Sequence, residues 1–230
     1  MFDFQPLKRD GMRMNDVPPR FQAARLVLAL RQAGVTDHRV TEAIETTPRD
    51  IFVPRPFEED AWDNVELPID CGQSMTRPVT VGVMLQALGA EKDHTVLEIG
   101  TGSGYVAGVL TRLARRVYSI DRYRTLVEKA RPPLEQMGVT SQVEIRHADG
   151  WFGWPEAAPF DRIIVTASSS ELPADLGRQL AVGGVAVMPI ERDGQEMIIR
   201  LVRQADGSLH EAKVGIGTFT ALQPGIAREL

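Results

Sequence analysis

The feature that most constrains the fold is a glycine-rich stretch near the middle of the chain, which reads VLEIGTGSGY over residues 96–105. An apolar run that predicts a β-strand ends in three glycines alternating with small hydroxyl residues, and a helical pattern follows at once. Glycine is needed where a backbone turns sharply and lets a ligand approach closely. A tight strand-to-helix turn without a ligand has the same pattern, so the stretch indicates a ligand site only together with other residues.

Strand and helix patterns alternate on both sides of this stretch. Apolar runs of strand length occur five times, and segments with helical spacing of apolar residues lie before and between them. The runs predict strands at residues 95–99, 117–120, 143–145, 162–167 and 184–190, and the segments predict helices at residues 21–33, 37–47, 79–88, 105–114 and 125–137. Strands that alternate with helices at this spacing indicate an α/β fold with a doubly wound, mostly parallel sheet and helices at the N-terminus.

Two local features refine this expectation. Pro132 and Pro133 fall inside the last predicted helix and must break or kink it, because proline lacks the helical N–H donor. Near the C-terminus, residues 196–204 and 211–219 read as strands with a turn at Gly207 and no long helix between them. They predict antiparallel edge strands, in an order that the pattern leaves open.

Composition limits the partners and the location. Of the 230 residues 43% are hydrophobic, and the net charge of −5 with no long basic run argues against a nucleic-acid partner. No stretch approaches the roughly 18 to 20 apolar residues that cross a membrane. The single cysteine, Cys71, indicates a reducing compartment, so a cytoplasmic protein is expected, with Cys71 as a small buried side chain. Four scattered histidines show no metal-ligand spacing, so no metal is predicted, and nothing indicates an oligomeric state.

The spacing of the glycines and the acid before them indicate the class of ligand. A dinucleotide site has the pattern G-x-G-x-x-G with the pyrophosphate at the helix N-terminus, whereas Gly100, Gly102 and Gly104 follow G-x-G-x-G. Glu98 stands two residues before the first glycine. Its charge is unfavourable beside a pyrophosphate and favourable beside a cationic, amino-acid-like ligand. S-adenosylmethionine fits, because it carries an α-ammonium and a sulfonium and no phosphate.

Two further acids stand where such a ligand needs them. Asp121 ends the second strand of the alternation, where a carboxylate can accept hydrogen bonds from both ribose hydroxyls, as it also does in dinucleotide sites. Asp149 follows the third strand, where its side chain can reach an adenine amino group while Gly150 lets the backbone come near. The carboxyl ends of parallel strands share one edge of the sheet, so the acids predict a methyltransferase cofactor site there.

Further segments make the sequence similar to a known family. They are GVTDHRV, PRDIFVP, LPIDCGQSMTRP, RVYSID, ADGWFGWPEAAPFDRIIVTAS and LAVGGVAVMPI, besides the glycine-rich stretch. Over about residues 25–203 the chain resembles the protein-L-isoaspartate (D-aspartate) O-methyltransferases, which methylate the α-carboxylate of isoaspartyl residues in damaged proteins. The resemblance implies a Rossmann-like class I methyltransferase fold, S-adenosyl-L-methionine as cofactor, S-adenosyl-L-homocysteine as product, and isoaspartyl-containing proteins or peptides as substrate in protein repair.

The expected organisation is one domain preceded by a leader. Residues 1–19 are polar and contain proline, and residues 20–230 form a single methyltransferase domain. Within the domain, residues 20–90 are the N-terminal helical and substrate-loop region, residues 91–190 the cofactor-binding core, and residues 191–230 the C-terminal strands.

Two segments depart from the family pattern. The family loop Gly-Gln-Thr-Ile-Ser-x-Pro corresponds to residues 72–78, GQSMTRP, so its active-site serine falls on Thr76. Threonine keeps the hydroxyl and adds a methyl group on Cβ, which stiffens χ1 and narrows the pocket. Near the C-terminus the family's Val-Arg-Phe-Val-Pro-Leu segment, which helps to close the substrate site, corresponds to residues 217–222, GTFTAL, with Thr218 and Ala221 in place of arginine and proline.

These observations predict the site residues. Thr76 is the predicted catalytic residue, within a substrate loop of Gln73, Ser74, Met75 and Thr76. The predicted cofactor-binding residues are Glu98, Gly100, Thr101, Gly102, Ser103, Gly104, Asp121, Asp149 and Gly150. Because a carboxylate is ionised at neutral pH, the reaction needs no strong general base, and the loop orients the carboxylate instead.

Two other functions stay open. The altered loop and C-terminal segment are compatible with a related O-methyltransferase that acts on a different peptide or small-molecule carboxylate. A non-catalytic protein that keeps the cofactor fold as a scaffold is the other alternative, and the intact glycines and acids count against it.

Overall fold

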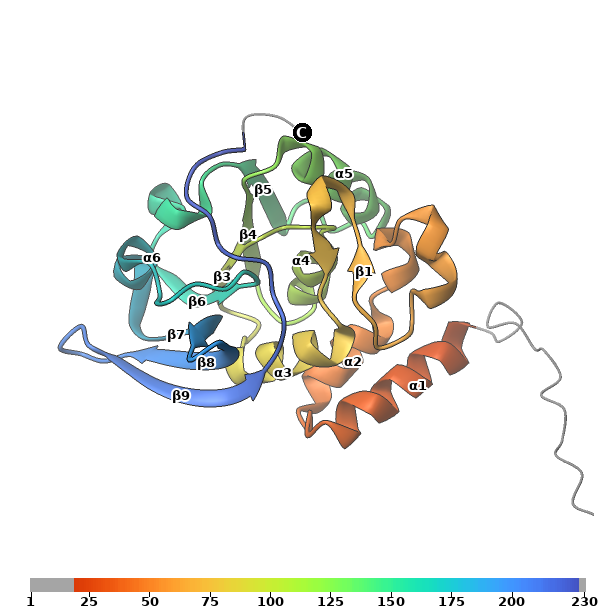
Figure 1. Cartoon of the computed structure of the whole chain (residues 1–230), viewed down its shortest axis with the longest axis horizontal. Helices are drawn as coiled ribbons and strands as arrows, with labels where there is room; N and C mark the ends of the chain where they lie inside the picture. Colours follow the sequence, from red (N-terminus) through yellow and green to blue (C-terminus); the bar gives the residue numbers. More distant parts are fainter. Residues whose placement is uncertain (1–18, 228–230) are drawn as a thin grey trace, which may run out of the picture.

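A seven-stranded mixed sheet forms the centre of the molecule, with helices on both of its faces (Figure 1). The computed structural model describes residues 19–227, so the expected leader lies outside the described residues except for Pro19, which begins the first helix. The strands run in the order β5-β4-β3-β6-β7-β8-β9. They are β3 (Thr95–Ile99), β4 (Arg116–Asp121), β5 (Val143–His147), β6 (Phe160–Val165), β7 (Leu180–Arg192), β8 (Gln195–Arg203) and β9 (Leu209–Ile216). The predicted α/β class is confirmed.

The first five of these strands along the chain are parallel, and their order reverses between β3 and β6. From β3 the chain moves outward through β4 and β5, then returns to β6 on the other side of β3. Ligands of open parallel sheets bind beyond the carboxyl ends of the strands at such a reversal. The topology therefore places the glycine-rich stretch, which follows β3, where a ligand site is expected.

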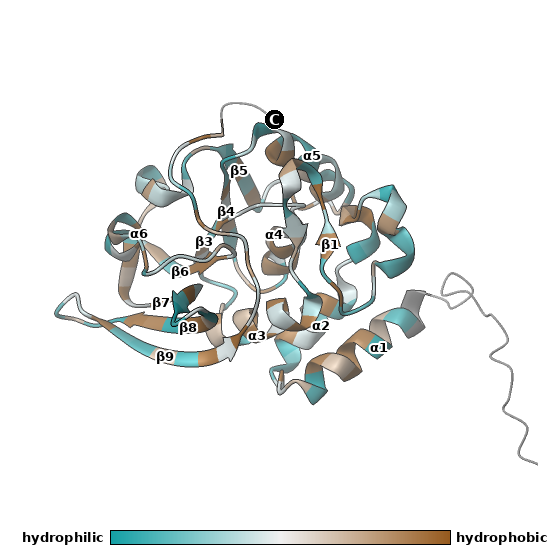
Figure 2. Cartoon of the chain, in the orientation of Figure 1, coloured by the Kyte–Doolittle hydropathy of each residue, from teal (hydrophilic) through white to brown (hydrophobic). Residues whose placement is uncertain are grey.

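Helices pack on the two faces because successive strand residues point to opposite sides. Val96 of β3 belongs to a core shared with the helices before β6, whereas Leu97 belongs to a second core shared with α6. The helices are α1 (Pro19–Gln32), α2 (His38–Thr46), α3 (Pro78–Leu88), α4 (Tyr105–Thr111), α5 (Arg124–Gln136) and α6 (Ala174–Gln179). In Figure 2 hydrophobic residues are concentrated on the inner strands and on helix surfaces turned toward them. None of the helices within residues 19–227 is long and apolar enough to cross a membrane.

The C-terminal strands are antiparallel, as predicted, and the structure gives their order. β8 pairs with β7, and β9 pairs with β8 and forms the edge of the sheet. The turn between β8 and β9 contains Gly207 with a φ of 85°, a left-handed conformation that glycine adopts without a Cβ penalty.

Of the two outcomes predicted for the prolines in the last helix, a break or a kink, the structure excludes the break. α5 runs from Arg124 to Gln136 with Pro132 and Pro133 inside it. Each proline removes a helical hydrogen bond and costs about 3 kcal/mol. The helix also buries an apolar face formed by Leu126, Val127, Ala130, Pro133 and Leu134, and we attribute its continuity to this packing, which offsets the cost.

The segment before α3 contains a short β-ribbon. β1 (Leu67–Pro68) and β2 (Ser74–Met75) pair as a short antiparallel ribbon, and a tight turn at Asp70–Gly72 joins them. Cys71 lies in this turn with a φ of 64° and is only partly buried. The expectation of a buried Cys71 is therefore wrong, because Cys71 lies in the turn between two short strands and not in the core.

Candidate functional site

The glycine loop, residues 100–104, connects β3 to α4 at the carboxyl edge of the sheet. Its three glycines have φ values of 97°, 53° and 87°, which L side chains rarely adopt. The N–H groups of Gly100 and Thr101 donate to the Ile120 carbonyl at 2.8 and 3.1 Å. A Cβ atom on Gly100 would lie 2.4 Å from the Thr166 Oγ1 atom, so space as well as backbone conformation requires glycine there.

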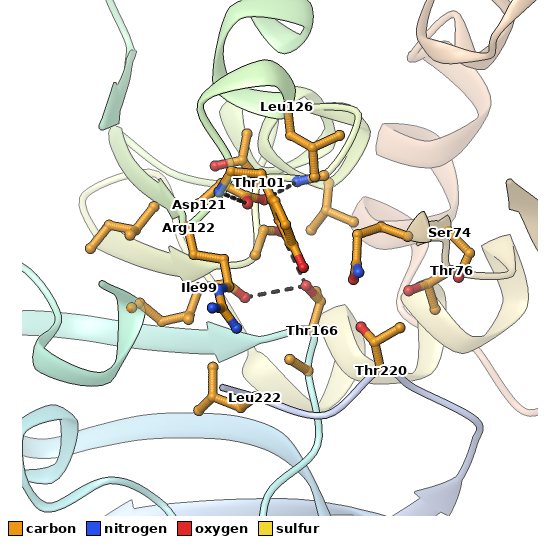
Figure 3. Close-up of a pocket in the computed structure, with 18 of the residues that line it drawn as sticks. Ser74, Thr76, Ile99, Thr101, Asp121, Arg122, Leu126, Thr166, Thr220 and Leu222 are labelled. Carbon is orange, nitrogen blue, oxygen red and sulfur yellow. Dashed lines mark hydrogen bonds between the residues drawn. The ribbon is translucent and has the colours of Figure 1, made fainter. Parts of the chain in front are cut away.

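A pocket of about 860 Å³, partly open to solvent, lies over this loop (Figure 3). We call residues 100–103 with Asp121 the pocket floor, and residues 73–76 with residues 220–223 the pocket rim. The remaining lining residues are Ile99, Tyr105, Val106, Ile120, Arg122, Tyr123, Leu126, Gly150, Thr166 and Ala167.

Asp121 lies on the pocket floor, as its position at the end of a strand predicts. Its Oδ2 atom accepts a hydrogen bond from the Gly102 N–H at 2.9 Å, and its Oδ1 atom accepts one from the Tyr123 N–H at 2.9 Å. Burial raises the pKa of this carboxyl, and these backbone hydrogen bonds oppose the rise. Since each carboxylate oxygen has two lone pairs, Asp121 can accept further hydrogen bonds from a ligand in the pocket.

Glu98 does not reach the pocket wall. Its side chain is fully buried, and its Oε2 atom accepts a hydrogen bond from the Ser119 Oγ atom at 2.5 Å. Its Oε1 atom has no hydrogen-bond partner among the described residues. Burial raises the pKa of Glu98 to about 8, the Ser119 hydrogen bond opposes the rise, and the neighbouring Asp121 charge adds to it. In this structure Glu98 therefore makes no direct contact with the space that a ligand would fill.

Asp149 also lies off the pocket wall. Its Oδ1 atom accepts a hydrogen bond from the Trp151 N–H at 2.9 Å, and its Oδ2 atom accepts one from the Gly225 N–H at 2.7 Å. The carboxylate therefore ties the turn after β5 to the C-terminal segment of the chain.

Two of the predicted glycines have different roles. Gly150 lines the pocket, and a Cβ atom on it would lie 2.5 Å from the Ile99 Cγ2 atom. Gly104 is buried and does not line the pocket. A Cβ atom on Gly104 would lie 3.0 Å from the Ala130 Cβ atom, so this glycine lets α4 and α5 approach each other closely.

The predicted substrate loop forms one side of the pocket rim. Gln73, Ser74, Met75 and Thr76 all line the pocket, and Ser74 and Thr76 stand on the same side of it in Figure 3. Ser74 donates a hydrogen bond to the carboxylate of Glu66. Arg77 is exposed and is not part of the lining, which agrees with its omission from the predicted site.

The C-terminal segment forms the other side of the rim. The Ser168 N–H donates to the Thr220 carbonyl at 2.8 Å, and the Leu222 N–H donates to the Ser168 carbonyl at 2.6 Å. Gln223 accepts a hydrogen bond from the Arg122 guanidinium. These bonds hold residues 220–223 beside the loop that follows β6, so segments more than 140 residues apart, 76 and 220, line one pocket.

Sequence reasoning missed several lining residues, among them Arg122 and Thr166, whose polar side chains come directly after a strand. Arg122 follows β4 directly, and its buried Nε atom has no partner among the described residues. Thr166 follows β6 directly, and its hydroxyl lies 3.1 Å from the Gly100 carbonyl oxygen. Both could have been found by the rule that identified Asp121, because residues just after parallel strands gather at one edge of the sheet.

One group of side chains lies close enough together to hold a cation, although the histidines showed no such spacing in the sequence. Glu91, Asp93 and His94 each have a potential ligand atom within 4.8 Å of the others. They lie in the turn before β3, where the Glu91 N–H donates to the His94 Nδ1 atom at 3.0 Å. The turn itself explains their proximity, and the group is not part of the pocket.

Comparisons with known proteins agree on one family. The sequence profile of protein-L-isoaspartate (D-aspartate) O-methyltransferases matches residues 21–224. A protein-L-isoaspartate O-methyltransferase of Maricaulis maris is 49% identical over 205 residues, covering 89% of this chain and 95% of the relative. One of Rhodospirillum rubrum is 45% identical, covering 88% of this chain and 93% of the relative.

Among solved structures, a protein-L-isoaspartate O-methyltransferase superposes with a TM-score of 0.77 at 24% identity, over 89% of this chain and 67% of that chain. A second, from Plasmodium falciparum in complex with S-adenosyl-L-homocysteine, superposes with a TM-score of 0.76 at 21% identity, over 86% and 97%.

Proposed function

Because this chain belongs to the protein-L-isoaspartate (D-aspartate) O-methyltransferase family, we propose that it transfers a methyl group from S-adenosylmethionine to the α-carboxylate of isoaspartyl residues in damaged proteins. The observation that carries the proposal is that the glycine loop and Thr76 line one pocket. The pocket floor thus has the features of a cofactor site, and the pocket rim carries the family's substrate loop.

The pocket floor suits S-adenosylmethionine better than a pyrophosphate. It presents the Asp121 carboxylate beside backbone that lacks side chains at Gly100 and Gly102. A carboxylate repels phosphate, whereas it accepts hydrogen bonds from ribose hydroxyls and attracts a cation. When bound, the cofactor supplies an electrophilic methyl group on a sulfonium. We assign Asp121 to the ribose and Gly150 to the close approach of the adenine.

The role predicted for Asp149 stays a proposal, because Asp149 does not line the pocket. Its Oδ2 atom accepts from the Gly225 N–H, and the second lone pair of each carboxylate oxygen lets Asp149 also accept from an adenine amino group. Glu98 acts on the ligand only through other residues, because it is buried behind the floor.

The pocket rim orients the carboxylate to be methylated. Within the described residues the pocket lining contains no histidine, the side chain that most often serves as a base, and its one carboxylate, Asp121, is assigned to the ribose. A carboxyl group with an ordinary pKa of about 4 is already ionised at neutral pH and needs no base, so positioning and the exclusion of water supply the catalysis. Thr76 is proposed to donate its hydroxyl hydrogen to one carboxylate oxygen, which leaves the other oxygen to attack the methyl carbon.

A related O-methyltransferase for another peptide or small-molecule carboxylate is the second candidate. The rim favours it, because Thr76 replaces the family serine and Ala221 replaces the family proline, and both line the pocket. The floor does not distinguish the two functions.

The remaining expectations stand as part of the proposal. Residues 20–230 form one domain, which is supported by the hydrophobic core that runs from Leu26 in α1 to Ile198 in β8. The single cysteine favours a cytoplasmic location. The proposed partners are isoaspartyl-containing proteins, and no nucleic acid or membrane.

Transfer of a labelled methyl group separates these possibilities. The protein is incubated with labelled S-adenosylmethionine and either an isoaspartyl peptide or its normal aspartyl twin. We expect base-labile label on the isoaspartyl peptide alone. Label on neither peptide, with S-adenosylhomocysteine binding intact, would contradict repair and leave the second candidate and the non-catalytic scaffold.

A further inference from the structure

Three buried side chains form a hydrogen-bonded chain that leads from the pocket into the sheet. Thr101 lines the pocket, and its Oγ1 atom lies 2.6 Å from the Ser119 Oγ atom. Ser119 Oγ lies 2.5 Å from the Glu98 Oε2 atom. The three residues are 3%, 0% and 0% exposed, respectively, so water does not interrupt the chain.

The inner end of the chain is a carboxyl group that favours its neutral form. Glu98 sits between Ser119 of β4 and Ile164 of β6 in the sheet register, so Ser119 is its polar neighbour there. Its Oε1 atom has no partner among the described residues, and an unpaired buried charge is costly. The charged group that acts on Glu98 is Asp121, which repels its ionised form, and His147 lowers the pKa of Asp121.

The direction of the hydrogen bonds depends on this proton, because each hydroxyl has one hydrogen to donate. When Glu98 is ionised, Ser119 donates to Glu98 and Thr101 donates to Ser119. Thr101 then turns lone pairs toward the pocket. When Glu98 is protonated, it donates to Ser119, and Ser119 donates to Thr101. Thr101 then has its own hydrogen free to donate into the pocket.

We propose that Ser119 is a positioning residue that couples the proton on Glu98 to the charge of the ligand in the pocket. The inference rests on the proposed function, in which the ligand carries an α-ammonium group. An ammonium has only hydrogens to donate, so it favours the state in which Thr101 accepts and Glu98 is ionised. On binding, the O–H bond of the Glu98 carboxyl breaks, the two hydroxyls reverse their donation, and one proton leaves to the solvent.

Calorimetry of S-adenosylhomocysteine binding tests this directly. Binding is measured between pH 6 and 7, where the ligand's ammonium stays protonated, in two buffers of different ionisation enthalpy. Because the pKa of Glu98 is about 8, we expect release of roughly one proton and an affinity that rises up to about tenfold from pH 6 to pH 7. 5′-Methylthioadenosine, which shares the adenosine but lacks the ammonium, is expected to bind without proton release.

Variants separate a positioning role from a structural one. Glu98→Gln keeps the shape of the side chain and mimics its protonated form, so it should bind more weakly than the wild type at pH 6 and at pH 7, and its affinity should not rise with pH. Ser119→Ala should bind S-adenosylhomocysteine without proton release, because Glu98 loses the bond that favours its ionised form. Thr101→Ser keeps the hydroxyl and should retain the release, whereas Thr101→Val should lose it.

The outcomes distinguish the inference from the proposed function. Proton release by the wild type and Thr101→Ser, and its loss in Glu98→Gln, Ser119→Ala and Thr101→Val, supports the coupling. Binding of S-adenosylhomocysteine without proton release in the wild type overturns the inference alone, as does unchanged release in Ser119→Ala. Failure of the wild type to bind S-adenosylhomocysteine contradicts the proposed function and the inference that rests on it.

Discussion

The pocket floor and the pocket rim are built in different ways. On the floor, Thr101 and Asp121 are 3% and 6% exposed, and backbone hydrogen bonds fix the loop to β4. On the rim, Thr76 is partly exposed and Thr220 is exposed, and the segments come from distant parts of the chain. The floor keeps the family pattern, whereas Thr76 and Ala221, which depart from it, both lie at the rim. We infer that the floor performs the part of the reaction common to all substrates, and that the rim selects the substrate.

The largest expected effect comes from the carboxyl group behind the floor. The pKa of Glu98 is about 4.5 when the chain is unfolded and about 8 when it is folded without ligand. At pH values between about 4.5 and about 8 the folded state binds more protons than the unfolded state. The free energy of unfolding of the ligand-free protein therefore falls as the pH rises. Glu98→Gln cannot ionise and so avoids this loss of stability at high pH. It should be more stable than the wild type by roughly 3 to 5 kcal/mol near pH 8.

Chemical denaturation at pH 5 and pH 8 checks this expectation. The difference between the two proteins should be small at pH 5 and grow toward pH 8. A difference that is the same at both pH values would show that Glu98 does not hold its proton in the fold.

The floor should also be sensitive to a single methyl group. Gly100→Ala places a Cβ atom 2.4 Å from Thr166 Oγ1 at a φ of 97°, so the loop and the pocket wall must shift. Strain of about 1 to 3 kcal/mol should weaken S-adenosylhomocysteine binding by roughly 10- to 100-fold.

Gly34→Ala is the matched control. Gly34 has a φ of 86°, and no atom lies within 4 Å of a Cβ built there. It should lose about 1 kcal/mol of stability and keep full affinity. Equal loss of affinity in both variants would mean that the effect is general destabilisation and not a property of the floor.

The smallest effect is expected at the rim, from restoring the family proline. The two bonds that hold the segment to Ser168 use the Thr220 carbonyl and the Leu222 N–H, so neither uses the Ala221 N–H. Ala221→Pro should therefore be tolerated and should raise stability by at most about 1 kcal/mol, through the unfolded state. Thermal unfolding measures this, and destabilisation by more than this amount would show that the segment has another backbone conformation at 221.

Whether a feature depends on neighbouring or on distant residues decides what the sequence could predict. The glycine loop and Asp121 were predictable because their pattern lies within a strand and the turn after it. The surroundings of Glu98 were not, since they depend on Ser119, 21 residues away in a neighbouring strand. The hydrogen bond between Asp149 and Gly225 spans 76 residues, and no local sequence pattern predicts it.

Other differences have similar causes. The continuity of α5 through two prolines goes with burial of one helix face, which local propensity does not describe. The fold class was predictable because alternating strands and helices have few ways to form a sheet. Arg122 and Thr166 were missed although they follow strands, because only the acidic residues at strand ends were taken as ligand groups.

Thr76 tests the division between floor and rim most directly. Thr76→Ser keeps the hydroxyl, and Thr76→Val keeps the shape without it. The measurement is methyl transfer to an isoaspartyl peptide at saturating S-adenosylmethionine, with the dissociation constant of S-adenosylhomocysteine determined for the same three proteins. Loss of a hydrogen bond to a charged group is worth about 1.5 to 3 kcal/mol, so kcat should fall roughly 10- to 100-fold in Thr76→Val alone. The dissociation constant should stay unchanged in both variants. Full activity of Thr76→Val, or weaker cofactor binding that parallels its loss of activity, would contradict the account.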